Sequence, residues 1–156
     1  MNSSGVWKLL HLFFAFSFVG SLVVAEWNGR AARATQNWGE RALLFNIIHL
    51  ATRIAGAGSL LVLGIVGNIL AIRMGYSMVA GSWLHWVNGL WLAAVLTMLI
   101  LVMPNAAKLS AATRAVARGE SAPGYARYLG RWRIGGVILS LIYLALLFLM
   151  VFHWRS

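Results

Sequence analysis

Four long runs of apolar residues make up most of the chain, and they constrain its fold more than any other feature. They extend roughly over residues 6–25, 47–72, 83–103 and 134–152. Each is long enough to cross about 30 Å of hydrocarbon as a helix that rises ~1.5 Å per residue. Of the residues, 61% are hydrophobic and 10% charged, whereas soluble domains are about 45–50% apolar and roughly 25% charged. The sequence therefore predicts an all-α integral membrane four-helix bundle, a single transmembrane domain over residues 1–156.

Basic residues lie mainly in the polar loops between these runs. The chain has 13 Lys and Arg residues against 3 Asp and Glu residues, a balance that nucleic-acid-binding proteins also show. Because the positive charges flank membrane-length runs, a lipid bilayer explains their placement better, and we expect no nucleic acid as a partner. The chain contains no cysteine, which excludes disulfides, thiolate metal sites and iron–sulfur clusters.

The distribution of Lys and Arg also predicts how the helices are oriented. Four spans place the loops 26–46 and 104–133 on one side with nine basic residues, against three on the other side. Cytoplasmic loops are enriched in Lys and Arg, so we expect both loops in the cytoplasm and both termini on the non-cytoplasmic side. The first run resembles a secretory signal with small residues at Val23–Ala25. Cleavage there would contradict the charge balance, so we expect a retained helix.

The second and third runs contain features beyond their length. Asn46, His49 and Arg53 follow each other at helical spacing and form a polar stripe near the cytoplasmic boundary. Asn68 is expected to hydrogen-bond a neighbouring helix. Small residues that allow close helix packing are Gly56, Gly58, Gly64 and Gly67. Residues 106–118 are expected to form a cytoplasmic amphipathic segment, either an extension of the third helix or a surface helix.

Histidines at matching depth provide the main functional hypothesis. His11 lies about one turn inside the outer end of the first run, His85 near the outer end of the third, and His153 at the end of the fourth. Two histidines on different helices can bind a b-type haem through both axial positions, and ionisable side chains in membrane spans are candidate sites by default. Gly89 follows His85 on the same helix face and would leave room for the macrocycle. We expect His11 and His85 as axial ligands, with His153 a substitute for either.

A second candidate site lies on the cytoplasmic side. His49 and Arg53 share a helix face, and Glu26 flanks the end of the first run. These residues are suited to a haem propionate or a quinone head group, or to an ordinary interfacial ion pair. Other interpretations also stay open for the outer histidines, which can hydrogen-bond water or lipid head groups, and for the glycines, which can serve helix packing.

Lys8-Leu-Leu-His11, followed by Phe18-Val-Gly-Ser-Leu22, resembles a known superfamily of four-helix membrane proteins. It comprises the bacterial membrane protoporphyrinogen oxidase, the copper-resistance D membrane proteins and small integral membrane proteins without assigned activity, to which this chain is most similar. The resemblance implies the bacterial inner (cytoplasmic) membrane, a haem b ligand at His11 and, for the oxidase branch, oxidation of protoporphyrinogen IX. Ala25–Arg30 replaces an aromatic segment of the oxidase, and His153 replaces a usual lysine, so only His11 is carried over.

Three functions follow as expectations. The first is a haem b-binding protein in electron transfer or redox chemistry, with an oxidoreductase activity similar to protoporphyrinogen oxidase left open. The second is a cofactor-free structural or assembly subunit, docking through its glycine-bearing second helix onto partner membrane subunits or a second copy. The third is copper handling through His11, His85 and His153, since imidazole is a suitable copper ligand.

Overall fold

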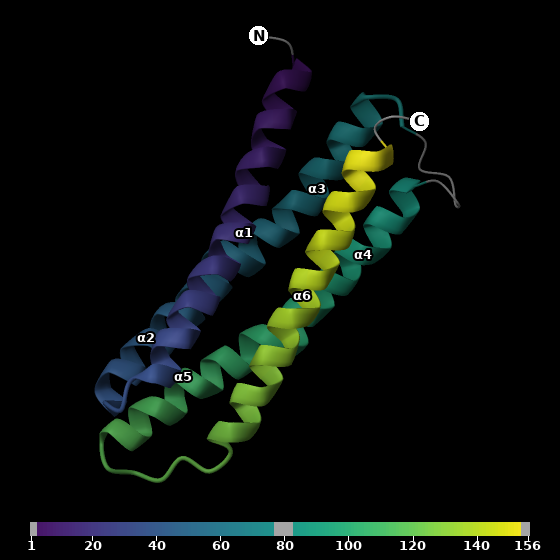
Figure 1. Cartoon of the computed structure of the whole chain (residues 1–156). Coiled ribbons are helices and arrows are strands. Elements are labelled where there is room, and N and C mark those ends of the chain that lie inside the picture. The colour runs from purple at the N-terminus through teal and green to yellow at the C-terminus, as the bar shows by residue number, and fades with distance from the viewer. Residues whose placement is uncertain (1–2, 77–82, 154–156) are drawn as a thin grey trace.

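The structure, a computed structural model, describes residues 3–76 and 83–153, which are helical apart from short turns (Figure 1). Its helical segments, in chain order, are α1 (Ser3–Ala34), α2 (Trp38–Ala51), the π-helical segment η1 (Thr52–Ala57), α3 (Gly58–Arg73), α4 (Trp83–Thr97), the π-helical segment η2 (Met98–Val102), α5 (Met103–Ala117) and α6 (Tyr125–His153). Segments α2–η1–α3 and α4–η2–α5 each run on without a break, so the described residues form four long helices.

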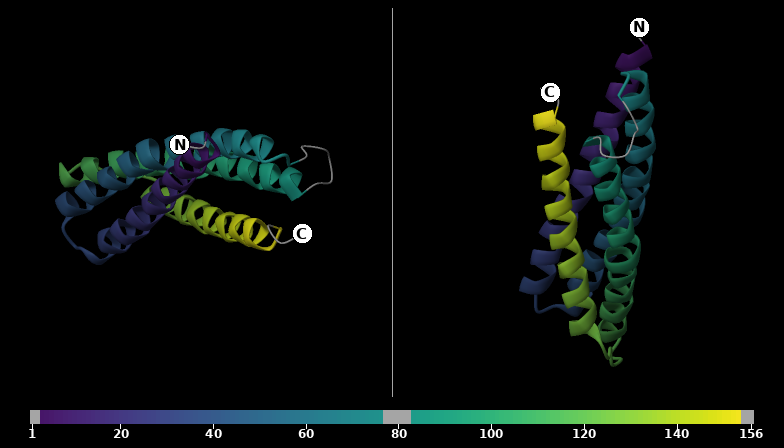
Figure 2. Two further views of the ribbon diagram at one scale, coloured as in Figure 1. Left: turned by 90° about the horizontal axis from the view of Figure 1, so that it is seen from above. Right: turned by 90° about the vertical axis from the view of Figure 1, so that its right-hand side faces the viewer.

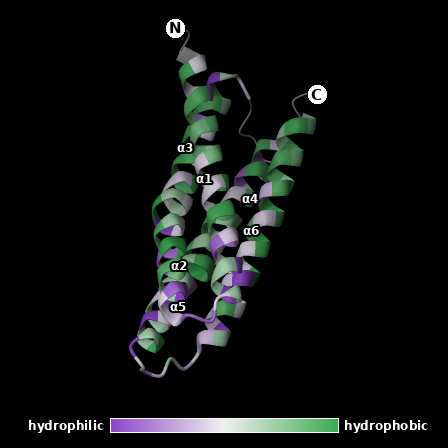
Figure 3. Cartoon of the chain, turned by 60° about the vertical axis from the view of Figure 1, so that its left-hand side comes forward, coloured by the Kyte–Doolittle hydropathy of each residue, from purple (hydrophilic) through white to green (hydrophobic). Residues whose placement is uncertain are grey.

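All four long helices contain stretches that are long and apolar enough to cross a membrane: Gly5–Ala34, Trp38–Arg73, Trp83–Ala117 and Tyr125–Phe152. Apolar residues cover most of their length, and polar residues gather at one end (Figure 3). We call that end the loop end, because it carries the turn 35–37 and the loop 118–124; the opposite end is the terminal end. The prediction of an all-helical bundle of membrane-length helices is confirmed.

The helices extend beyond the apolar runs because the flanking polar residues are good helix formers. The first helix continues through Glu26-Trp-Asn-Gly-Arg-Ala-Ala-Arg33 to Ala34, since Ala, Glu and Arg all have high helix propensity. It stops before Asn37, whose side chain accepts hydrogen bonds from the backbone N–H groups of Gly39 (2.8 Å) and Glu40 (3.3 Å) and so caps α2. Residues 106–117 extend the third long helix and do not form a separate surface helix.

Pro104 lies within the third long helix without ending it. A proline lacks the backbone N–H and its ring clashes with the carbonyl four residues earlier. Here it stands at the start of α5, directly after the π-helical turn η2. A π turn pairs backbone groups five residues apart, so the wider turn relieves this conflict and the helix continues to Ala117.

Packing links long helices that are consecutive in the chain. The first packs on α2, η1 and α3, the second on the third, and the third on α6, while α1 and α6 do not pack along their lengths. Their ribbons diverge toward the terminal end in both views of Figure 2. Isolated side-chain contacts join them, including the Phe18 and Tyr143 rings with centroids 6.3 Å apart. The largest fully buried side chains of the core include Phe45, Ile48, Leu60, Met98, Leu109 and Leu139.

Candidate functional site

A cavity of about 240 Å³ lies between the helices in the half of the bundle near the terminal end. Residues from α1, α3, α4 and α6 line it, and it is partly open. The α1 side contributes His11, Ala15 and Phe18, and the α6 side contributes residues such as Tyr143 and Met150. Because α1 and α6 do not pack along their lengths, the cavity lies along the line where the bundle is not closed. Predominantly apolar cavities with few polar groups are typical of small-molecule sites.

Among the histidine side chains that the structure describes, His11 is the one that lines this cavity. The Nδ1–Cε1 edge of its ring lies against α3, where a Cβ added to Gly67 would be 3.0 Å from Cε1 and 3.2 Å from Nδ1. The backbone of Leu63 lies beside the ring, yet Nδ1 is buried without a hydrogen-bond partner. With Nδ1 facing the α3 backbone, Nε2 is the nitrogen suited to bind a ligand. Gly67 therefore gives room to the imidazole and not to a macrocycle.

A pair of asparagine side chains forms part of the cavity wall. The Asn68 amide nitrogen donates to Asn88 Oδ1 (2.9 Å), and the Asn88 amide nitrogen donates to Asn68 Oδ1 (3.1 Å). Asn68 also donates to the Gly64 carbonyl (2.9 Å). This confirms the expectation that Asn68 bonds a neighbouring helix, and it fixes the register of α3 against α4.

Trp91 forms a flat, rigid wall deeper in the cavity. Its Nε1 donates to the Leu60 carbonyl (2.8 Å), and its indole lies against Gly64, where an added Cβ would overlap the ring. An indole N–H in an apolar setting needs such an acceptor. The absence of a side chain at Gly64 therefore makes room for Trp91 of the same chain.

The expected pair of His11 and His85 is not brought together. Residues of α4 that line the cavity are Trp83, Leu84, Val87, Asn88, Trp91 and Ala94. One residue step in a helix rotates the side chain by about 100°, so His85 points away from this face; it is exposed and stacks edge-on against Trp86. Gly89 is also exposed, with open space where a Cβ would stand. His153 is the last residue of α6, and its side chain lies outside the described residues.

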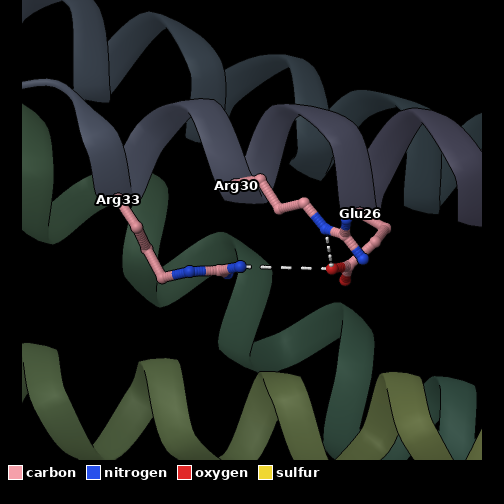
Figure 4. Close-up of polar contacts among 3 residues, drawn as sticks. All are labelled: Glu26, Arg30 and Arg33. Atoms are coloured by element: carbon pink, nitrogen blue, oxygen red, sulfur yellow. Dashed lines mark hydrogen bonds and ion pairs between the residues drawn. The ribbon is translucent and has the colours of Figure 1, made fainter.

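At the second candidate site, at the loop end, the residues that come together also differ from the expected ones. Glu26 forms ion pairs with Arg30 (2.8 Å) and Arg33 (4.0 Å), both on α1, and Figure 4 shows its carboxylate between them. His49 is half-buried with an unpaired Nδ1, and Arg53 is exposed. No ion pair joins either residue to Glu26 in the described part of the chain. Arg33 was missed, although its spacing of seven residues from Glu26 places both on one helix face.

Sequence reasoning also missed Asn88, Trp91 and Tyr143 as cavity residues. The depth of Trp91 inside an apolar run was a usable signal, because interfacial tryptophans normally lie near the ends of spans. Asn88 carried the same signal, as a polar amide within a run. No feature of the sequence marked Tyr143 as a cavity residue.

Haem b fits these residues in part. His11 offers an imidazole at the wall of an apolar cavity, with an unpaired buried nitrogen on the side of α3. His85 and Gly89 do not line that cavity, so the described side chains would offer a haem one histidine and not the expected pair. In the described part of the chain, no three His, Cys, Asp or Glu side chains gather as a metal site. The three-histidine copper set includes the undescribed His153 side chain and stays a prediction.

No protein-family model matches the chain, and neither the curated proteins nor the solved structures contain a match. The resemblance to the protoporphyrinogen oxidase and copper-resistance D superfamily therefore stays a prediction.

Proposed function

We propose that this protein is an integral membrane protein that binds haem b at His11 and acts in electron transfer or redox chemistry. The observation that carries the proposal is the His11 ring, which lies at an apolar cavity with its Nδ1–Cε1 edge against α3, so that Nε2 is the nitrogen left for a ligand.

The chain's own residues would hold and orient the group. A neutral imidazole is a common haem ligand, and the nitrogen that does not bind iron normally faces a carbonyl or another acceptor that fixes the ring. The Leu63 backbone is in that position for His11. Trp91 and Tyr143 form aromatic walls, and most of the remaining lining is apolar. A bound haem would supply a one-electron redox centre.

We further propose that the loop end is cytoplasmic and the terminal end lies outside, in a bacterial inner membrane. The excess of Lys and Arg in the two long loops supports this orientation. The haem site would then lie in the outer half of the membrane. An oxidase activity on protoporphyrinogen rests on the resemblance alone.

The test is a reduced-minus-oxidised absorption spectrum with a pyridine haemochrome assay on protein purified from cells with ample haem. Wild type and His85→Ala should both carry close to one haem b per chain, whereas His11→Ala should lose it. His49→Ala, a histidine outside the cavity, is the matched control. If His11→Ala keeps its full haem complement, the assignment of His11 is wrong. If wild-type protein from such cells carries no haem, the cofactor is wrong.

The assembly-subunit hypothesis loses its expected docking face but stays a prediction. Three of the glycines on the second long helix face side chains of the same chain: Gly56 faces Ser21 and Met98, while Gly64 and Gly67 face Trp91 and His11. A partner subunit or second copy would have to use other surfaces, such as the exposed apolar faces of the helices.

A further inference from the structure

A cluster of arginines and aromatic residues lies at the loop end, where the last turns of α1 approach the first turns of α6. It is made of Arg30 and Arg33 from α1, with Tyr125 and Trp132 from α6. A Cβ added at Gly29 of α1 would be 2.5 Å from the Trp132 ring and 3.5 Å from Arg33 Nη1, so the guanidinium lies beside the indole. We refer to these four residues as the arginine cluster.

Arg33 has a donor that the chain does not satisfy. Its side chain is 29% exposed, and Nη1 is buried without a hydrogen-bond partner. A guanidinium keeps its charge at all physiological pH values and presents five N–H donors. A charged donor without an acceptor is costly; Nη1 itself is covered, so an anion outside the bundle would reach this guanidinium through the part that leaves the side chain 29% exposed.

Glu26 does not supply that anion. Its carboxylate oxygen is 2.8 Å from Arg30 Nε and 4.0 Å from Arg33 Nη2, so it pairs closely with Arg30 and only distantly with Arg33. Two arginines and one glutamate leave a net charge of +1. The neighbouring Arg41 is already used, because its guanidinium donates to the Ala32 (2.8 Å) and Thr35 carbonyls.

The surroundings favour a lipid over a dissolved ion as the source of the anion. Tyrosine and tryptophan mark the membrane interface, and at the loop end the first residue of α6 is the half-buried Tyr125, while Trp132 covers the guanidinium of Arg33 from inside the bundle. Trp27, one turn before Arg30 on α1, is 75% exposed and offers apolar surface to acyl chains near that arginine.

We propose that the arginine cluster binds the phosphate group of an anionic phospholipid in the leaflet at the loop end. Arg33 is the principal donor, and planar guanidinium groups bind phosphate oxygens in pairs. Arg30 adds positive charge, and the Tyr125 hydroxyl adds a donor at the interface. This site is independent of the proposed haem site, which lies at the other end of the bundle.

Native mass spectrometry of the detergent-solubilised protein, titrated with phosphatidylglycerol or phosphatidylcholine, tests the proposal. Phosphatidylglycerol should bind at least about tenfold more tightly than phosphatidylcholine, because the choline ammonium cancels the charge of the phosphate that both lipids carry; tenfold corresponds to about 1.4 kcal/mol. Arg33→Gln should remove this preference. Arg131→Gln, an exposed arginine near the start of α6, is the matched control and should change the affinity less than about twofold, as exposed charges are screened.

Two further arms keep the result decisive. Arg33→Lys keeps the charge without the paired donors and should bind phosphatidylglycerol about threefold more weakly than wild type; equal binding would contradict the role given to the guanidinium, even if Arg33→Gln does not fold. Inorganic phosphate at millimolar concentration should not displace the lipid. Displacement, or equal affinity for the two lipids, would overturn the proposal.

Discussion

His11 differs from His49 and His85 in the surroundings of its ring. It lies on a stripe of α1 residues at spacings of three and four, through Ala15 and Phe18 to Gly29, and this stripe faces the cavity and α6. The sequence indicated its depth and its residue type. It could not indicate which way His85 points, because lipid is as apolar as a protein core. A helix that is apolar all round carries no pattern that separates its buried face from its lipid face.

Close packing at Gly64 can be tested with a single methyl group. Gly64→Ala should destabilise the protein by ~1–3 kcal/mol, because the new Cβ would overlap the Trp91 indole and force it to shift. The matched control is Gly58→Ala on the same helix, where a Cβ meets open space; it should be neutral or stabilising by up to ~1 kcal/mol. Thermal unfolding in detergent, followed by circular dichroism, measures both. Equal melting temperatures for the two variants would contradict this account of Trp91.

At the scale of helices, the apolar runs predicted the number and order of the long helices but not their full extent. Helix α1 runs to Ala34 and the third long helix to Ala117, because polar helix formers continue what the apolar runs begin. The π-helical segments η1 and η2 had no recognisable signal apart from Pro104 beside η2. Hydropathy identifies the segments that are apolar enough to lie in a membrane. It does not identify helix ends, because these depend on capping and turn residues such as Asn37.

The reciprocal amide pair between α3 and α4 predicts strong coupling. Asn68→Leu or Asn88→Leu alone leaves a partly buried amide without its partner and should cost ~1–3 kcal/mol. The double variant removes both polar groups and should be destabilised by less than the sum of the two single variants, with a coupling energy between ~0.6 and ~1.7 kcal/mol, the average and the largest value for hydrogen bonds between membrane helices. A double-mutant cycle on unfolding in detergent gives this value. Additive single effects would mean that the two amides do not interact.

For the whole molecule, composition alone was enough to predict a membrane helix bundle, because the runs are long enough to span a bilayer and the remaining segments are too short for a soluble domain. The open line between α1 and α6 could not be predicted, since it depends on which helices pack along their lengths. The cavity and the arginine cluster both lie along this line. The sequence therefore did not indicate which helices pack together, and so it could not locate the two sites that lie between helices.

The orientation of the bundle is open to direct measurement, because the chain has no cysteine to interfere. Gln36→Cys and Ser121→Cys, both exposed at the loop end, should react with a membrane-impermeant thiol reagent only after the membrane is permeabilised. Gly5→Cys, exposed near the start of α1, should react in intact spheroplasts. The reverse pattern of labelling would place the loops outside and show that the charge balance misled us.

The order of packing has a consequence for how the chain is made. Every extended helix–helix interface joins neighbours in the chain, and the ring from α1 to α6 is not closed. Such a bundle can assemble one hairpin at a time as it leaves the ribosome, since contacts between neighbours close first. A nascent chain that ends at Ala117 already contains the first three long helices, so it can form both the interface of the first with the second and that of the second with the third. The last helix would then add to a finished surface, without any earlier helix having to move aside.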